Sequence, residues 1–386
     1  MKRIYSIDLM RGIVMIIMAL DHVRDLLHTT SLTDQPTNLA TTTPALFFTR
    51  WVTHLCAPTF VFLSGVSAFV SMKNRNDMYA TRRFLLIRGV WLMALEFTLV
   101  NFGLLFDVRF KILIFEVIAA IGLGFIVLAF LINRSPKTIG IIGLAIMFLH
   151  NLAPLVPGSE SSVFKKVLMP FFAPGVIPLG GDRSCFMAYP PLPWLAIMLI
   201  GFATARFFTL EIQKQRSVFL KLALASFTMF IILRAINIYG DPVPWSQQKN
   251  GVYTFLSFIN LTKYPPSLQF CLLFPGIMFL ILSAVQGIKG KITDVISVYG
   301  KVPLFYFLVH FYIIHSLVFV MVFLQGFSPS DLEFGFNFGR PKSGSGLALW
   351  AIYLVWTGIV VVMYPLCKWY ARYKEAHKEK KWLRYL

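Results

Sequence analysis

The sequence predicts an all-α fold: a polytopic integral membrane protein of about ten transmembrane helices, with both termini in the cytoplasm. Hydrophobic residues make up 57% of the 386 residues and charged residues only 14%, whereas soluble domains carry roughly 25% charged residues. Apolar runs recur along the whole chain, and basic residues gather in alternate connections between them. We therefore expect a single membrane domain, residues 1–386, without a soluble domain.

The individual spans follow from the requirement for about 20 consecutive, mostly apolar residues. Ten segments meet it: 7–27, 46–70, 84–106, 112–132, 138–156, 191–209, 218–238, 267–286, 302–325 and 347–370. The segment 163–179 is apolar but interrupted by prolines, so a re-entrant or interfacial piece is an alternative there. The first segment resembles a signal peptide, but Asp8 and Arg11 interrupt it and no small-residue cleavage site follows. We expect it to be a retained helix.

The placement of lysine and arginine sets the orientation, because basic connections stay in the cytoplasm. With the N-terminus inside, the inside connections carry about twice as many basic residues as the outside ones. The longer connections 157–190, 239–266 and 326–346 then lie outside, where we expect them to cap or line a cavity. The basic, aromatic stretch 371–386 becomes a cytoplasmic tail suited to contact with anionic membrane lipid.

Several function classes do not fit this composition. The net charge of +19 is spread over short segments between apolar runs, so we expect no nucleic-acid partner. The four cysteines include no CxxC pair. The seven histidines show no HExxH or comparable spacing, and we expect no metal site.

The first helix carries ionisable residues, which cost at least ~2.5 to 3.5 kcal/mol each within a membrane. At 100° per residue, Asp8, His22 and Asp25 fall within about 60° of Arg11, so all four share one face. Arg11 and His22 are about 16 Å apart along the axis. Histidine suits general-base work near neutral pH, and Asp21 or Asp25 is a candidate to orient it. Arg11 is expected to pair with Asp8.

Further ionisable residues fall within other predicted spans. His54 lies in the outer part of the second span, near Pro58 and Gly65, where it would meet His22 or bond to a neighbouring helix. The remaining candidates are Glu96, Glu116, Arg234, His310 and His315. For all of these residues a structural polar seam is the alternative to a catalytic or transport role.

Six segments carry a family resemblance. Two are long, IYSIDLMRGIVMIIMALDHVRDLLH at 4–28 and FFTRWVTHLCAPTFVFLSGVSAF at 47–69; four are shorter, RGVWLMALE at 88–96, YPPLPWLAIMLIGF at 189–202, YGKVPLFYFLVHFYIIH at 299–315 and LVWTGIVVVMYPLCKW at 354–369. They resemble bacterial membrane proteins similar to the catalytic domain of heparan-α-glucosaminide N-acetyltransferase. The resemblance implies transfer of an acetyl or related acyl group from cytoplasmic acyl-CoA, here acetyl-CoA, to a sugar or glycan acceptor at the outer face of the cell's inner membrane.

The spacing of Arg11 and His22 is also similar to the arginine and histidine pair of membrane acyltransferases that O-acetylate bacterial surface polysaccharides. By this resemblance His22 becomes the catalytic base or acyl relay, with Asp21, Asp25 and His54 as further catalytic candidates. Arg11 with Asp8 becomes an anchor facing coenzyme A. Apart from the resemblance, the basic groups at the inner face, chiefly Arg82, Arg83, Arg88 and Arg206, are expected to bind its phosphates, and positive-inside topology alone is the alternative explanation for them. The lysosomal enzyme's catalytic histidine would align near Pro44 and is absent, which leaves His22, His28 and His54 as substitutes.

Two other functions use the same buried charges. A transporter or flippase would line a substrate or proton path with them, and paired broken helices in inverted repeats would favour it; the sequence shows none. A non-catalytic membrane scaffold is the second alternative. The sequence leaves open whether the acceptor is an amine or a hydroxyl and whether the chain forms a homodimer.

Overall fold

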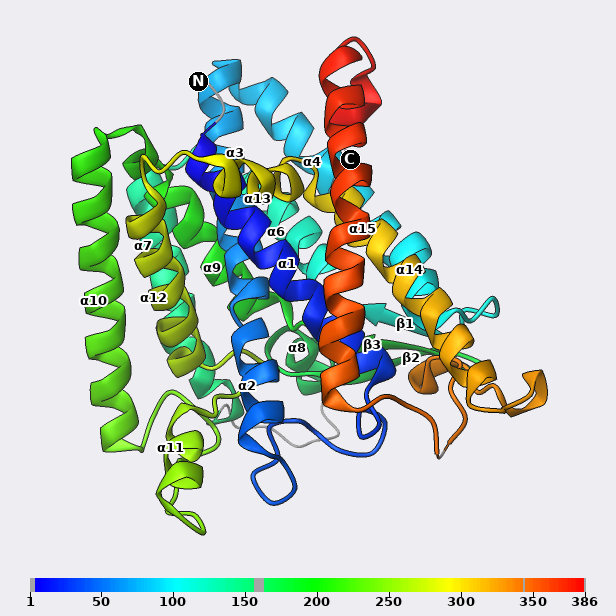
Figure 1. The fold of residues 1–386 in the computed structure, drawn as a ribbon. Helices are drawn as coiled ribbons and strands as arrows, with labels where there is room; N and C mark the ends of the chain where they lie inside the picture. The colour runs from blue at the N-terminus through cyan, green and yellow to red at the C-terminus, as the bar shows by residue number, and fades with distance from the viewer. Residues whose placement is uncertain (1–3, 156–162, 343, 385–386) are drawn as a thin grey trace. The chain divides into compact units, whose positions relative to one another are not determined.

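The computed structural model describes residues 4–155, 163–342 and 344–384, and these residues are mostly helical (Figure 1). They form two compact units. The first, called here the α1 unit, consists of Tyr5–Cys56, Phe97–Ile112 and the described residues from Ile288 onward. The second, the α9 unit, consists mainly of Ala57–Glu96 and Leu113–Gly287. A single membrane domain over 1–386 stays a prediction.

Eight helical segments among the described residues are long and apolar enough to cross a membrane. They are Pro44–Arg75, Met78–Leu105, Pro136–Ala153, Pro191–Thr209, Ile212–Ile236, Leu268–Val285, Pro303–Leu324 and Leu349–Ala376. Each coincides with one of the predicted segments. The chain is therefore a polytopic membrane protein, as predicted.

The other two predicted spans are also helical but do not belong to these eight. α1 (Tyr5–Leu27) has 23 residues, enough to cross a bilayer, but it carries several charged side chains. α6 (Val117–Leu131) is apolar but has only 15 residues. The predicted span 112–132 begins too early, because Ile112–Phe115 forms strand β1 and the helix starts only after Glu116. The structure thus supports eight spans, and a count of ten stays a prediction.

The prediction of an all-α chain missed a small sheet. β1 pairs with β3 (Arg183–Met187), which pairs in turn with β2 (Gly175–Gly180) in the order β1-β3-β2. β2 and β3 form an antiparallel hairpin, and Gly180 and Gly181 at its turn have φ angles of +99° and +61°. Only glycine takes up such angles readily. The short helix α8 (Val163–Phe172) precedes this hairpin, while residues 156–162 of the predicted external connection lie outside the described residues.

The α9 unit is built around α9 (Pro191–Thr204), whose Trp194, Ala196 and Phe202 are fully buried. α9 packs against α6, α7 (Pro136–Leu149) and α8. α10 (Ile212–Ile236) lies beside α12 (Leu268–Val285), as Figure 1 shows, and α4 (Met78–Leu95) packs on α6. α11 (Gly251–Ile259), η2 (His150–Leu155) and η3 (Ala205–Thr209) complete this unit.

The α1 unit is built around α1. This helix packs against α2 (Pro44–Thr53), α13 (Lys291–Lys301), α14 (Pro303–Leu324) and α15 (Leu349–Ala376), and Figure 1 shows α13 and α15 beside it. The contact with α13 is backbone against backbone: a Cβ atom on Gly300 would lie 1.8 Å from the carbonyl oxygen of Asp8, and one on Gly12 would lie 2.0 Å from that of Ile296. Glycine at both positions therefore permits this approach. The remaining elements are α5 (Asn101–Leu105), η4 (Pro329–Asp331), η5 (Gly335–Asn337) and η6 (Lys381–Arg384).

The predicted second span is two helices. α2 starts at Pro44, where the side chain of Thr43 accepts a hydrogen bond from the backbone of Leu46. It ends before His54, and α3 (Cys56–Arg75) follows. Pro58 accounts for the interruption, because proline has no N–H to donate to the carbonyl of His54 four residues earlier. The third predicted span is interrupted as well, by the π-helical turn η1 (Glu96–Val100) between α4 and α5.

Candidate active site

α1 is enclosed by protein along most of its length. Its side chains of Asp8, Asp21 and Arg24 are buried, with exposed fractions of 4%, 7% and 2% for the whole residues. Arg11 and His22 are half-buried. Charged residues in membrane helices face the protein interior because lipid cannot solvate them. The enclosure of α1 explains why this helix tolerates so many charges.

An acid–base pair lies near the N-terminal end of α1. Arg11 Nη1 is 3.9 Å from Asp8 Oδ1, so the predicted pairing of these two residues is present. One turn earlier, the hydroxyl of Tyr5 donates a hydrogen bond to Asp294 Oδ1 at 2.8 Å and lies 2.9 Å from Thr293 Oγ1 in α13. This end of α1 is therefore fixed to α13 by side chains as well as by the glycine contacts.

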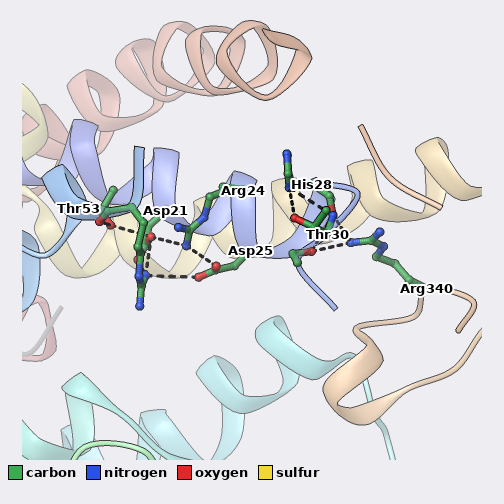
Figure 2. A network of polar contacts seen from close by, with 9 residues as sticks. Asp21, Arg24, Asp25, His28, Thr30, Thr53 and Arg340 are labelled. Atoms are coloured by element: carbon green, nitrogen blue, oxygen red, sulfur yellow. Dashed lines mark hydrogen bonds and ion pairs between the residues drawn. The ribbon is translucent and has the colours of Figure 1, made fainter. Parts of the chain in front are cut away.

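A cluster of four charges, in which Asp21 and Arg24 are buried, lies toward the C-terminal end of α1 (Figure 2). Arg24 Nη2 donates to Asp21 Oδ1 at 2.8 Å and also binds Asp25. From α2, Arg50 Nη1 lies 2.6 and 2.5 Å from the two carboxylate oxygens of Asp21, and the Thr53 hydroxyl donates to Asp21 at 2.7 Å. Two carboxylates face two guanidinium groups, so the charges of the cluster balance. The cluster joins α1 to α2.

His22 was expected to share a face with Asp25, but it contacts α14, whereas Asp25 contacts Arg24 and Arg50. The Nδ1 atom of His22 is 2.6 Å from Nε2 of His310, and its ring stacks on Phe311 with the ring centroids 4.3 Å apart. Phe307 meets the same ring edge-on at 6.2 Å. His310 is fully buried, and its Nδ1 atom is 2.9 Å from the carbonyl oxygen of Tyr306. The half-buried imidazole of His22 is thus held by a second imidazole and by aromatic rings.

The sequence had suggested that Asp21 or Asp25 orients His22. The structure shows these carboxylates bound to Arg24 and Arg50, and it shows His310 bound to His22. Orientation of His22 by a carboxylate stays a prediction. The role of Asp21 and Asp25 that the contacts support is to fix the end of α1 against α2.

The connection after α1 is held by another buried arginine. Arg340 Nη1 donates to the carbonyl oxygens of Leu26 and His28 at 3.2 and 3.0 Å, and Nη2 donates to that of Ser345 at 2.5 Å. Figure 2 shows Arg340 next to His28 and Thr30. Burial lowers the pKa of Arg340 to about 10. Burial first, then Arg24 and Arg340, lower the pKa of His28.

His28 and His54, the two alternatives to His22, have different settings. His28 is buried, and its Nδ1 atom lies 3.1 Å from the hydroxyl of Thr30. His54 is buried at the interruption between α2 and α3, and its backbone N–H donates to the carbonyl oxygens of Trp51 and Val52. His22 is the more exposed of the three, so it is better placed to meet a substrate.

The remaining candidate residues belong to the α9 unit. Arg82 and Arg83 are exposed on α4, Arg88 is half-buried, and Arg82 lies over the ring of Phe130. The buried Glu96 accepts a hydrogen bond from the backbone N–H of Ala119 at 2.8 Å, at the start of α6. A carboxylate in this position complements the positive end of a helix. The proposed contact of these arginines with a substrate stays a prediction.

Arg234 has a structural role. Its guanidinium group donates to the carbonyl oxygens of Ser257 and Phe258 at 2.8 Å each and to that of Asn260 at 3.0 Å. These carbonyls lie at the C-terminal end of α11, where the last carbonyls of a helix have no N–H group four residues further on in the helix to bind. Arg234 therefore anchors the connection 239–266, and the sequence-level alternative of a polar path through this residue finds no support in its contacts.

Sequence reasoning missed several residues that build the site. Arg24 lies three residues after Asp21, a spacing that predicts a pair on one helix face, whereas Arg50 and Arg340 looked like ordinary outside charges. No local signal connects His22 to His310, which follows 288 residues later. Within the described residues, no three His, Cys, Asp or Glu side chains gather in a way that would hold a metal ion.

The fold and this site define a polytopic membrane protein with a charged, protein-enclosed first helix that presents an imidazole. A family model for heparan-alpha-glucosaminide N-acetyltransferase, catalytic, matches residues 3–239, more than half of the chain. The chain belongs to this family, and membership implies N-acetyltransferase activity. No curated protein matches the chain. The match covers α1 through α10 but not α14, so the resemblance of segments 299–315 and 354–369 stays a prediction.

Proposed function

We propose that the chain is a membrane-bound acyltransferase that moves an acetyl or similar acyl group from cytoplasmic acetyl-CoA to a sugar or glycan at the outer face of the cell's inner membrane. The observation that carries this proposal is His22: a half-buried imidazole on a buried, charged helix within the part of the chain that the family model matches. The implied N-acetyltransferase activity makes an amino group the first acceptor to test, followed by a hydroxyl group.

The proposed reaction is a direct transfer in which His22 is the general base. His22 takes the proton of the acceptor's N–H or O–H group, and the acceptor atom forms a bond to the acyl carbon. The bond between that carbon and the coenzyme A sulfur breaks, and the leaving thiolate takes the proton from His22. A route with a covalent acyl-histidine is the alternative, and it ends in the same products.

The donor's position in the proposal follows from the two ends of α1. Arg11 and Asp8 lie near the end that positive-inside placement assigns to the cytoplasm, and His22 lies about 16 Å further along the helix. A donor whose anionic part stays near cytoplasmic arginines would need to extend its thioester over this distance. The long, thin pantetheine arm of coenzyme A suits that geometry. Arg82, Arg83 and Arg88 are proposed to bind its phosphates.

The test uses the full-length protein purified in detergent, with acetyl-CoA labelled in the acetyl group. Wild type should transfer label to a glucosamine-terminated acceptor or release it to water, and His22→Ala should abolish both. His377→Ala, which removes a histidine of the tail end, is the matched control and should retain activity. Both variants should be shown to elute as folded protein before their activities are compared.

The outcome also decides between the proposal and its alternatives. If wild type neither binds coenzyme A nor moves an acyl group, the acyltransferase proposal is wrong. Substrate-dependent flux across vesicles containing the same protein would then support a transporter or flippase. Activity in His22→Ala equal to that of wild type would instead remove His22 from the reaction and direct attention to His28 and His54.

A further inference from the structure

The pair formed by His22 and His310 permits a specific assignment of protons. The carbonyl oxygen of Tyr306 can only accept a hydrogen bond, and Nδ1 of His310 lies 2.9 Å from it. Nδ1 of His310 therefore carries a proton. In a neutral imidazole the other nitrogen is then the acceptor, so Nε2 of His310 carries a lone pair.

The same reasoning extends to His22. Its Nδ1 atom lies 2.6 Å from Nε2 of His310, and one of these two nitrogens must donate. Because Nε2 of neutral His310 accepts, Nδ1 of His22 donates. Neutral His22 then carries its proton on Nδ1 and its lone pair on Nε2. The neutral form of His310 is the one that suits its setting, since the ring is fully buried, stacks on Tyr306 and packs at a tilt against Phe311 with the centroids 4.7 Å apart.

We propose that His310 is the positioning residue of this site: it fixes His22 in the tautomer whose Nε2 atom takes the proton in the reaction. The inference rests on the proposed function for its catalytic consequence, although the tautomer itself does not depend on it. His310 lies outside the region that the family model matches. Nε2 of His310, itself oriented by the Tyr306 carbonyl, accepts the hydrogen bond from Nδ1 of His22. In other enzymes a carboxylate accepts this bond and fixes the tautomer of the catalytic histidine.

Packing reinforces the assignment. The rings of His22 and Phe311 stack with an interplanar angle of 23°, and the rings of His22 and His310 are inclined by 28°. The imidazole of His22 is therefore restrained in the plane that keeps Nδ1 on His310. Rotation of the ring by half a turn would put the carbon Cδ2 where Nδ1 lies and break the 2.6 Å hydrogen bond. In the observed arrangement the basic nitrogen is the one that points away from His310.

The spectroscopic test needs no substrate. Protein labelled with ¹⁵N in the histidine rings should show, at neutral pH, a His22 signal with a protonated Nδ1 and an unprotonated Nε2; the signal is assigned by its loss in His22→Asn. In His310→Phe, which keeps an aromatic ring but removes the acceptor, the His22 nitrogens should move toward a mixture of tautomers. A wild-type signal with the proton on Nε2 would overturn the proposal.

The kinetic test uses three variants of α14. His310→Phe should lower kcat by about 100-fold or more, as loss of the correct tautomer does in other enzymes, with KM for acetyl-CoA changed less than about twofold. His310→Gln, whose amide oxygen has a comparable reach, should recover part of this loss. His315→Phe is the matched control, because His315 is equally buried on the same helix but stacks on Phe106. It should retain wild-type kcat.

The outcomes separate this inference from the proposed function. An inactive wild type would contradict the proposed function while leaving the tautomer measurement to decide the role of His310. An active wild type, an inactive His22→Ala and a fully active His310→Phe would retain the function but refute the positioning role. Equal losses in His310→Phe and His315→Phe, with unchanged His22 nitrogen signals, would identify a packing defect instead and would also refute it.

Discussion

Nδ1 of His22 lies 2.6 Å from Nε2 of His310, and these residues are 288 positions apart in the chain. The same offset of 288 joins Tyr5 to Thr293, and Gly12 meets Gly300 with it as well. Contacts along α1 therefore follow the chain order of the successive helices α13 and α14. The contacts extend from Tyr5 to His22, about 25 Å at 1.5 Å per residue. The position of the histidine pair thus depends on backbone contacts nearly three turns away.

The first prediction concerns the glycine contact between α1 and α13. A Cβ atom on Gly300 would lie 1.8 Å from the carbonyl oxygen of Asp8, and backbone cannot move aside as a flexible side chain can. Gly300→Ala should lower the free energy of unfolding by about 3 kcal/mol, the upper part of the range for overpacking. It should also lower activity, because the shift is transmitted to His22. Unfolding in mixed detergent, followed by circular dichroism, measures the first effect.

The control for this prediction is Gly358→Ala in α15, where nothing lies within 4 Å of an added Cβ. Alanine favours a helix over glycine by about 0.5 to 1 kcal/mol, so this variant should match or slightly exceed wild-type stability. Equal stability of the Gly300 and Gly358 variants would show that α1 and α13 are not in close contact.

The sequence predicted most of the helical framework for a simple physical reason. Lipid requires long apolar helices, and this requirement appears locally as runs of apolar residues. The same argument identified α1 as unusual, since charges such as Asp8 and Arg11 stand out within an apolar run. The pairing of Asp8 with Arg11 also follows from helical spacing alone.

The features that the sequence did not predict depend on contacts between distant segments. Arg50 lies near the outer end of the predicted span 46–70, where basic residues are common, and only the packing of α2 on α1 makes it the partner of Asp21. The strand β1 was assigned to a helix because a short apolar run has no distinguishing period. His310 was recognised as polar and buried, but nothing in its neighbourhood in the sequence connects it to His22.

The second prediction concerns the charge cluster between α1 and α2. Arg50→Met would leave Asp21 and Asp25 with Arg24 as the remaining guanidinium partner among the contacts described for the cluster. Removing one partner of a buried ion pair costs about 3 to 5 kcal/mol. Asp21→Asn should be destabilising as well. The double variant should lose less free energy of unfolding than the sum of the two single variants, because neither charge is then left without its partner. Additive losses would show that the two residues do not interact.

The third prediction concerns the buried guanidinium of Arg340. Arg340→Lys keeps the charge but replaces a planar fork with one nitrogen, which cannot reach the carbonyl oxygens of Leu26, His28 and Ser345 together. We expect a loss of about 3 kcal/mol, since hydrogen bonds from charged donors contribute about 1.5 to 3 kcal/mol each. Thermal unfolding measures this loss.

Lys342→Ala provides the control for Arg340→Lys. Lys342 pairs with Glu333 at 3.4 Å, but its side chain is 79% exposed. An exposed pair of this kind contributes about 0 to 1 kcal/mol, so the variant should be close to wild type. Similar losses in the two variants would contradict the anchoring role of Arg340.

The fourth prediction is a pH dependence that originates at His28. Burial and the positive charges of Arg24 and Arg340 lower the pKa of His28 below its ordinary value of 6.5. Between the folded-state pKa and 6.5 the unfolded chain binds more protons than the folded one, so stability rises with pH in this window. Acidification from about pH 7 through this window should therefore destabilise the protein, and His28→Gln should show a shallower decline. All other titrating groups are common to both proteins, so the difference between their two stability curves isolates His28. If the difference in stability between wild type and His28→Gln does not change with pH, His28 has the same pKa in the folded and unfolded states. That result would contradict the lowering of its pKa by burial, Arg24 and Arg340.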